Sequence, residues 1–338
     1  MPGYITRSVR LLAIPLLLAG VAGGVAPGTA SAAQAGTAGT AVPFSISGTL
    51  ADVAATSASN AWAVGTTGRL RSKPLIVHWN GTAWKQVPSP APANSVLNGV
   101  AATSVTNAWA VGLTGNSGSD KTLILRWNGM AWKQMSSPSP AGGAGLSGVA
   151  ADSAGGAWAV GFNGPGATNK TLILRWNGTA WKQVPSPSPG APNPDTLRGV
   201  AAGSAGTAWA VGCTTCATAS GFNGPLIEGW NGKAWAQTPT PGLGAPGGIL
   251  AGVAAISATS AWAVGGTESG VGTSEVITTL IARWNGTKWT RVPSPTPGGR
   301  AALSGVAAVS ATSAWAVGNV GAGKTLIERW NGTAWKVS

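Results

Sequence analysis

The chain has 338 residues, of which 52 are glycine, 44% are hydrophobic and only 9% are charged. Its formal net charge of +13 arises from 21 Lys and Arg against 8 Asp and Glu, so acidic residues are scarce rather than basic ones clustered. Nucleic-acid-binding proteins typically combine a basic stripe with a recognisable reading module. Neither feature is present, and we expect no nucleic-acid partner. Weak attraction to anionic polymers or cell-wall components fits this charge better.

Residues 1–32 are typical of a secretory signal peptide. Arg7 and Arg10 precede an apolar stretch at 11–25, and small residues at 30–32 form a cleavage site. An uncleaved membrane anchor is the alternative, but the stretch is shorter than the roughly 20 residues that a membrane span needs. We therefore expect a secreted, extracellular protein with no membrane span. Loss of the two arginines lowers the formal charge from +13 to +11.

Eighteen tryptophans form six evenly spaced triplets, and none lies outside them. The first member of each triplet recurs after 47, 49, 51, 53 and 53 residues. A repeat of this length is typical of propellers, solenoids and arrays. The triplets are Trp62, Trp79 and Trp84; Trp109, Trp127 and Trp132; Trp158, Trp176 and Trp181; Trp209, Trp230 and Trp235; Trp262, Trp284 and Trp289; and Trp315, Trp330 and Trp335.

The second unit shows the predicted elements of every repeat. Short apolar segments at 97–102, 108–111, 122–127 and 131–135 are separated by turn residues, and a Ser-Pro-Ser-Pro segment follows. Proline cannot continue a strand ladder. No apolar period of helix length is present, so the pattern predicts four short strands and an all-β protein.

The Trp-Asn-Gly-x-x-Trp segment predicts a hairpin between the third and fourth strands. Its turn could contain two residues or four. In both cases Leu125, Trp127 and Trp132 lie on one face of the sheet, and Ile124 and Arg126 lie on the other.

A four-stranded sheet of this size must bury its apolar faces against neighbours. Six sheets arranged radially can do so and close on themselves, which predicts a six-bladed β-propeller with four antiparallel strands per blade. An open β-solenoid is the alternative, but it needs polar capping repeats, and the last unit is as rich in tryptophan as the others. We place the blades at 50–96, 97–145, 146–196, 197–249, 250–302 and 303–338, after a flexible leader at 33–49. Residues 40–45 of that leader could instead add an outer strand to the last blade by pairing with 333–337.

The segments AWAVG, LILRWNG and AWKQV, followed by prolines, resemble the kelch repeat and the tryptophan-rich propeller proteins that bacteria export. The resemblance covers nearly all of the mature chain. The kelch double glycine occurs only at Gly265-Gly266, and tryptophan replaces the tyrosine usual in the third strand. The WNGTAW hairpin is similar to the Asp-box of sialidase-like propellers without its Asp and Ser. These resemblances imply the fold and no activity.

One end of the blades carries the connections that differ most between units, and binding sites usually lie on such loops. The loops are 66–74, 113–122, 162–171, 213–225, 266–279 and 319–325. A partial ring of lysines borders them and is a candidate binding rim for an anionic ligand; the alternative is surface charge copied with the repeat. The lysines are Lys73, Lys121, Lys170 and Lys324.

The arginines that precede the third-strand tryptophans should point to the neighbouring blade and stack on indole. They are Arg126, Arg175, Arg283 and Arg329. We interpret the tryptophans as structural, with a carbohydrate platform as the alternative for exposed indoles. The hairpin pairs of the first three blades are Trp79, Trp84, Trp127, Trp132, Trp176 and Trp181.

The two cysteines, Cys213 and Cys216, lie in one loop and predict a local disulfide. Free thiols are the alternative. A redox motif would need a βαβ unit, and a metal site would need more ligands, while the only histidine, His78, lies in another repeat.

Catalytic chemistry is not expected, and neither is a metal or a cofactor. Without the signal peptide the chain has no tyrosine, which both the copper oxidases with kelch-type propellers and the sialidases require. Glycoside hydrolysis needs two facing carboxyl groups. Glu228 and Glu328 are equivalent but lie in the fourth and sixth units, so we interpret them as partners for nearby cations.

The sequence therefore favours a secreted, non-catalytic binding scaffold that presents variable loops to extracellular glycans or proteins, and we expect a monomer. The first alternative is a structural or adhesive repeat protein with no small-molecule site. The second is a glycan-active enzyme.

Overall fold

The computed structural model describes residues 46–68, 73–116, 119–152, 155–203, 206–216, 224–243, 247–269, 276–321 and 323–338. The predicted signal peptide lies outside this part of the chain, as do the leader residues 40–45 with their possible outer strand. In the described part, no helix is long and apolar enough to cross a membrane.

In the part of the chain that the structure describes, twenty-four strands form six separate sheets of four, and each sheet comes from one contiguous segment. We number the sheets one to six in chain order. Sheets one to three contain β1 (Thr49–Ser57), β2 (Asn60–Thr67), β3 (Lys73–Trp79), β4 (Trp84–Gln86), β5 (Ser95–Ser104), β6 (Asn107–Thr114), β7 (Lys121–Trp127), β8 (Trp132–Met135), β9 (Ala144–Ala151), β10 (Ala157–Asn163), β11 (Lys170–Trp176) and β12 (Trp181–Val184).

Sheets four to six follow the same order of strands, and one 3₁₀ turn, η3 (Pro297–Gly299), precedes the last sheet. Their strands are β13 (Thr196–Ala202), β14 (Ala208–Thr214), β15 (Gly224–Trp230), β16 (Trp235–Gln237), β17 (Gly248–Ser257), β18 (Ser260–Ser269), β19 (Val276–Trp284), β20 (Trp289–Val292), β21 (Ala301–Ser310), β22 (Ser313–Val320), β23 (Lys324–Trp330) and β24 (Trp335–Val337).

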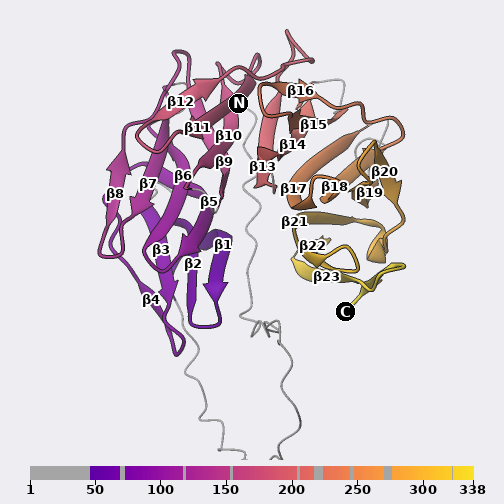
Figure 1. The fold of residues 1–338 in the computed structure, drawn as a ribbon, viewed down its shortest axis with the longest axis horizontal. Coiled ribbons are helices and arrows are strands. Elements are labelled where there is room, and N and C mark those ends of the chain that lie inside the picture. The colour runs from indigo at the N-terminus through magenta and orange to yellow at the C-terminus, as the bar shows by residue number, and fades with distance from the viewer. Residues whose placement is uncertain are drawn as a thin grey trace, which may run out of the picture.

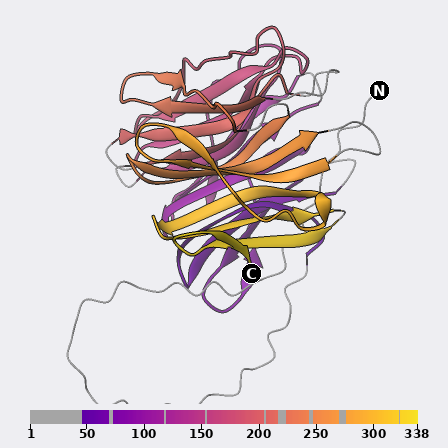
Figure 2. The same ribbon diagram turned by 90° about the vertical axis from the view of Figure 1, so that its right-hand side faces the viewer.

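The six sheets lie around a common centre as the blades of a propeller (Figure 1). The first strand of each blade lies towards the centre and the fourth towards the outside, and Figure 2 shows the blades from the side. All strand pairs are antiparallel in consecutive order. The predicted all-β, six-bladed propeller is confirmed.

The hairpin between strands three and four has a four-residue connection. Trp127 pairs directly with Trp132, and the Asn128 side chain accepts hydrogen bonds from the backbone N–H groups of Met130 and Ala131 at 3.0 and 2.9 Å. Gly129 has a φ of 95°, a conformation that favours glycine. The Asn128 side chain thus provides hydrogen-bond acceptors for the backbone of the connection. Of the two turn lengths that the sequence allowed, the structure has the four-residue one.

The core lies between blades rather than within them. Five apolar clusters each combine two successive sheets, and each has a tryptophan from strand two of one blade packed against the hairpin pair of the next. At the first boundary, the Trp62 ring lies 4.8 Å from Trp127 and 5.1 Å from Trp132. Leu125 joins this cluster while Ile124 joins the next one, as the predicted alternation requires.

Sheet six and sheet one do not share such a cluster in the described part of the chain. The sixth apolar cluster, around Leu75 and Val77, is confined to sheet one and the residue Ile46 before it. The sequence predicts that six blades close on themselves. Among the described residues, no strand from one terminus joins the sheet of the other, and no apolar cluster spans this boundary.

Candidate functional site

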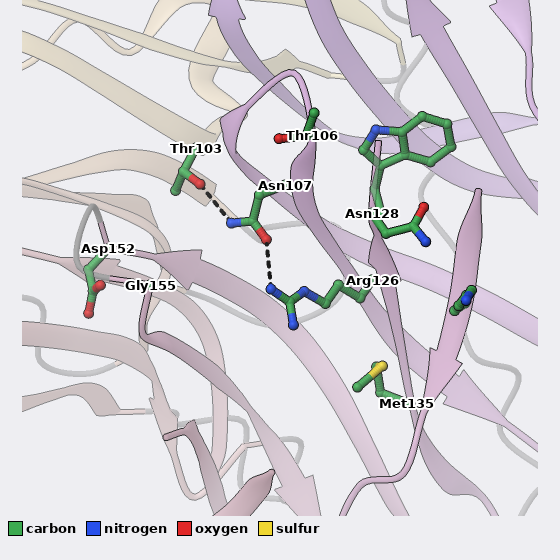
Figure 3. A pocket seen from close by; sticks show the side chains of 10 residues that line it. Thr103, Thr106, Asn107, Arg126, Asn128, Met135, Asp152 and Gly155 are labelled. Atoms are coloured by element: carbon green, nitrogen blue, oxygen red, sulfur yellow. Dashed lines mark hydrogen bonds between the residues drawn. The ribbon is translucent and has the colours of Figure 1, made fainter. Parts of the chain in front are cut away.

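A pocket of about 720 Å³ opens between sheets two and three (Figure 3). It lies at the end of the blades where strands one and two connect, opposite to the loops of variable length. Its wall combines hydrogen-bonding, charged and apolar side chains. These side chains include those of Thr103, Asn107, Arg126, Trp127, Lys133 and Asp152.

Two short connections of sheet two and one edge of sheet three position these groups. Asn107 begins β6 directly after the turn from β5, and Arg126 lies opposite Lys133 in the β7–β8 pair. Asp152 follows β9 of the next sheet, where its carboxylate accepts a hydrogen bond from the Gly156 N–H at 2.7 Å. The pocket therefore exists only where two successive blades meet.

Arg126 is the central group of the pocket. Its guanidinium carbon lies 5.0 Å from the Trp109 ring centre and 5.4 Å from that of Trp176, so an indole from each of the two blades stacks on it. The guanidinium also donates to the Asn107 amide oxygen at 3.4 Å, and the Asn107 amide donates to Thr103 Oγ1 at 2.7 Å. The predicted stacking on a neighbouring blade is confirmed for Arg126, Arg175 and Arg283, whereas Arg329 stacks on Trp315 of its own sheet.

The arrangement suits a ligand that carries negative charge and hydroxyl groups. Arg126 and Lys133 supply two positive charges, whereas the one carboxylate of the wall, Asp152, already accepts a backbone hydrogen bond. Asn107 and Thr103 add neutral hydrogen-bonding groups. Trp127 lines the edge of the pocket, but its indole packs on Trp62 at the boundary of sheets one and two.

The equivalent positions differ from one boundary to the next. In sheet one, His78 replaces the arginine: its Nε2 lies 2.8 Å from the Asn60 amide oxygen and its ring 4.2 Å from that of Trp62, and burial lowers the pKa of His78. In sheet four, Gly229 stands there, and the Trp209 ring approaches it closely. Arg175 and Arg283 repeat the two-indole arrangement of Arg126.

The four candidate lysines are exposed and lie at the start of the third strand of sheets one, two, three and six. They lie at the opposite end of the blades from the pocket. The structure does not bring them together with Arg126 or Lys133. Parts of the variable loops beside them lie outside the described residues, and the basic rim stays a prediction.

Tryptophans pack between blades at five boundaries, whereas Trp79 and Trp84 contact each other at 5.9 Å and no described indole of another blade. Trp132, Trp176 and Trp181 are buried, whereas Trp79, Trp84 and Trp127 are half-buried. Trp127 lines the edge of the pocket, but its indole packs on Trp62, so the pocket adds no support to the alternative of a carbohydrate platform.

Cys213 and Cys216 form a disulfide, as predicted. Within the described residues, no group of three or more His, Cys, Asp and Glu side chains is placed to hold a metal ion.

Glu228 and Glu328 do not have the cationic partners that we expected. Both side chains are fully buried, and neither carboxyl has a hydrogen-bond partner among the described residues. Their third strands turn these residues towards the preceding blade, at positions where the second and fifth units have Leu125 and Ala282. Burial, with a smaller contribution from Asp195, raises the pKa of Glu228 to about 8, and burial raises that of Glu328 to about 7.

Sequence reasoning missed the pocket because its two walls come from different repeats. Thr103 and Asp152 occupy the same position of successive units, where the first unit also has threonine and the other units have glycine, isoleucine or valine. Alignment of the six units at this position would have shown that the short-turn end also varies.

Solved structures similar to this chain are propellers. The structure of YCF48 bound to D1 peptide matches 86% of this chain and 81% of its own with a TM-score of 0.53 and 15% identity. YCF48 from Cyanidioschyzon merolae matches 88% and 87% with a TM-score of 0.52 and 17% identity. The propeller domain of the Trilobed protease from Pyrococcus furiosus, described as having an open velcro topology, matches 87% and 84% with a TM-score of 0.51 and 9% identity.

At these identities the likeness shows the fold alone. No protein-family model matches the chain, and neither does any curated protein. The chain is a six-bladed β-propeller, and its resemblance to kelch repeats remains one of sequence pattern.

Proposed function

We propose that this protein is an exported, non-catalytic, kelch-like binding scaffold and that its ligand is an acidic extracellular glycan. The pocket between sheets two and three carries the proposal, because it combines Arg126, Lys133 and neutral hydrogen-bonding groups in one concave site. Recognition of a polar ligand by a few convergent groups in a concave site is the usual arrangement. The formal charge of +11 that remains without the predicted signal peptide would add long-range attraction to an acidic polymer.

The titratable groups support binding rather than catalysis. Glu228 and Glu328 lie in separate, non-adjacent sheets, and His78 contacts an amide and an indole. An acid–base pair needs two such groups within reach of one substrate bond.

Glycan arrays that include acidic and neutral polysaccharides test this function. We expect binding to acidic glycans that weakens as salt rises, because exposed charges are screened within about 10 Å at 0.1 M salt. Lys133→Ala should weaken binding about tenfold, which corresponds to about 1.4 kcal/mol.

Lys121→Ala is the matched control, because this lysine belongs to the same sheet but lies at its other end. Equal binding by wild type and Lys133→Ala would exclude the pocket. Loss of binding in Lys121→Ala alone would move the site to the predicted lysine rim.

The structural or adhesive alternative is favoured by one observation, the burial of most indoles between blades in five tryptophan triads. Indoles used for packing are not free to bind sugar. A complete absence of binding on the arrays would favour this alternative.

A further inference from the structure

The two ends of the propeller carry unmatched halves of the contact that joins all other blades. We call the face of a sheet that turns to the following sheet its leading face, and the opposite one its trailing face. At the boundary of sheets five and six, the leading face contributes Ile256, Trp262 and Val264. The trailing face contributes Trp330 and Trp335, together with small apolar residues.

The leading face of sheet six repeats this apolar set but leaves it exposed. Val309, Trp315 and Val317 are 79%, 39% and 46% exposed, whereas the equivalent Trp262 and Val264 are both 0% exposed. Gly305, which lies near the centre of the propeller, also has more free space on its leading side than the equivalent Gly252. A methyl group added to the equivalent Gly252 would meet the Gly305 Cα at 3.0 Å, whereas one added to Gly305 would meet only Val317 of its own sheet.

The trailing face of sheet one is the matching half. Val53 is 49% exposed, and Trp79 and Trp84 are half-buried, whereas Trp330 and Trp335, the equivalents of these two indoles, are buried. Ile46 covers part of this face by packing near Leu75.

Arg329 indicates what is missing at this boundary. Arg283 lies 5.1 Å from the Trp262 ring and 5.7 Å from that of Trp330, so it contacts indoles of two blades. Arg329 lies 5.2 Å from Trp315 of its own sheet, and the described residues place no indole of another sheet on it. The residue equivalent to Trp330 in the first unit is Trp79.

We propose that a second copy of this chain supplies the missing half, so that the leading face of sheet six packs on the trailing face of sheet one of its neighbour. Trp315 would then contact Trp79 and Trp84 of the other copy, and Trp79 would complete the stack on Arg329. Each blade boundary joins two different faces, which makes the contact between copies head-to-tail. Among the described residues, the leading face of sheet six and the trailing face of sheet one share no apolar cluster, and a second copy can dock without moving the five packed boundaries. This inference is independent of the proposed ligand.

Light scattering coupled to size-exclusion chromatography of the purified full chain tests the proposal. Wild type should show a molar mass that rises with concentration to at least twice that of the monomer. Trp315→Glu on the leading face and Val53→Glu on the trailing face should each remain monomeric. Met130→Glu is the control: this residue is 85% exposed on the hairpin of sheet two, so the variant should associate as wild type does.

An equimolar mixture of the Trp315→Glu and Val53→Glu variants is the decisive sample. It retains one intact leading face and one intact trailing face on different molecules, so it should form a complex of twice the monomer mass that grows no further. Closure of each chain on itself predicts monomers in the mixture, and a symmetric dimer through one face predicts that one of the two variants dimerises on its own; either result would overturn the proposal. A wild type that stays monomeric at its highest soluble concentration would also overturn it. Val317→Glu replaces Trp315→Glu if circular dichroism shows that the latter does not fold.

Discussion

Glu228 is the residue whose charge state is most strongly altered by the fold. Its carboxyl is fully buried and has no hydrogen-bond partner among the described residues, and burial raises its pKa to about 8. Folding therefore favours the neutral acid, and the ordinary value for glutamate is about 4.3. The protein should be most stable, as far as this group is concerned, below pH of about 4, and should lose stability as pH rises towards 8.

Glu228→Gln keeps the shape of the side chain and removes this titration. We expect equal unfolding free energies of the variant and wild type near pH 4. At pH 9 the variant should be more stable by about 3–5 kcal/mol, because each pKa unit corresponds to about 1.4 kcal/mol. Urea unfolding at both pH values measures the difference. A constant difference across the range would show that the carboxyl does not titrate with folding.

Two glycines at the centre of the propeller allow a matched test of blade spacing. A methyl group on Gly252 would lie 3.0 Å from the Gly305 Cα and 3.2 Å from the Ser304 carbonyl oxygen, so backbone would have to move. Gly252→Ala should therefore cost about 1–3 kcal/mol of stability. Gly305→Ala meets only the Val317 side chain at 3.6 Å and should be nearly neutral in dilute solution. Equal losses in the two variants would contradict the packing described here.

At the scale of elements, the tryptophan of the second strand joins one blade to the next. Trp262 is fully buried against Trp330 and Trp335, at ring distances of 5.0 and 5.2 Å. Trp262→Ala should destabilise the protein by about 3–5 kcal/mol, as expected for a large buried side chain. Trp315→Ala, at the equivalent but exposed position, should cost clearly less in dilute solution. Thermal unfolding of the two variants compares them directly.

The strands, the hairpins and the two faces of each sheet could be predicted because they depend on neighbours within one repeat. The alternation around Trp127 predicts that Leu125 and Arg126 lie on opposite faces of sheet two. The structure confirms this, because Leu125 packs towards sheet one and Arg126 stacks on Trp176 of sheet three. The role of Glu228 could not be predicted, because its surroundings come from a preceding blade. For the same reason the pocket between Thr103 and Asp152 could not be predicted from a single repeat. Its two walls lie about fifty positions apart in the sequence and belong to different repeats.

At the scale of the whole molecule, repetition explains both the stability of the ring and its open boundary. Six similar units form five boundaries when the chain is linear, so one leading face and one trailing face are left over. Sequence repetition predicts that these two faces match. It does not say whether they meet within one chain, and the predicted closed ring rested on the repeat count alone.

Two possible binding surfaces lie at opposite ends of the blades: the pocket at the end with the short turns, and the lysines at the other end. The most direct test of the proposed function is an experimental structure of the full chain with the acidic oligosaccharide that binds it best. We expect the ligand between sheets two and three, with its acidic group against Arg126 and Lys133. A ligand held by the variable loops and the lysines Lys73, Lys121 and Lys170, with an empty pocket, would contradict this account.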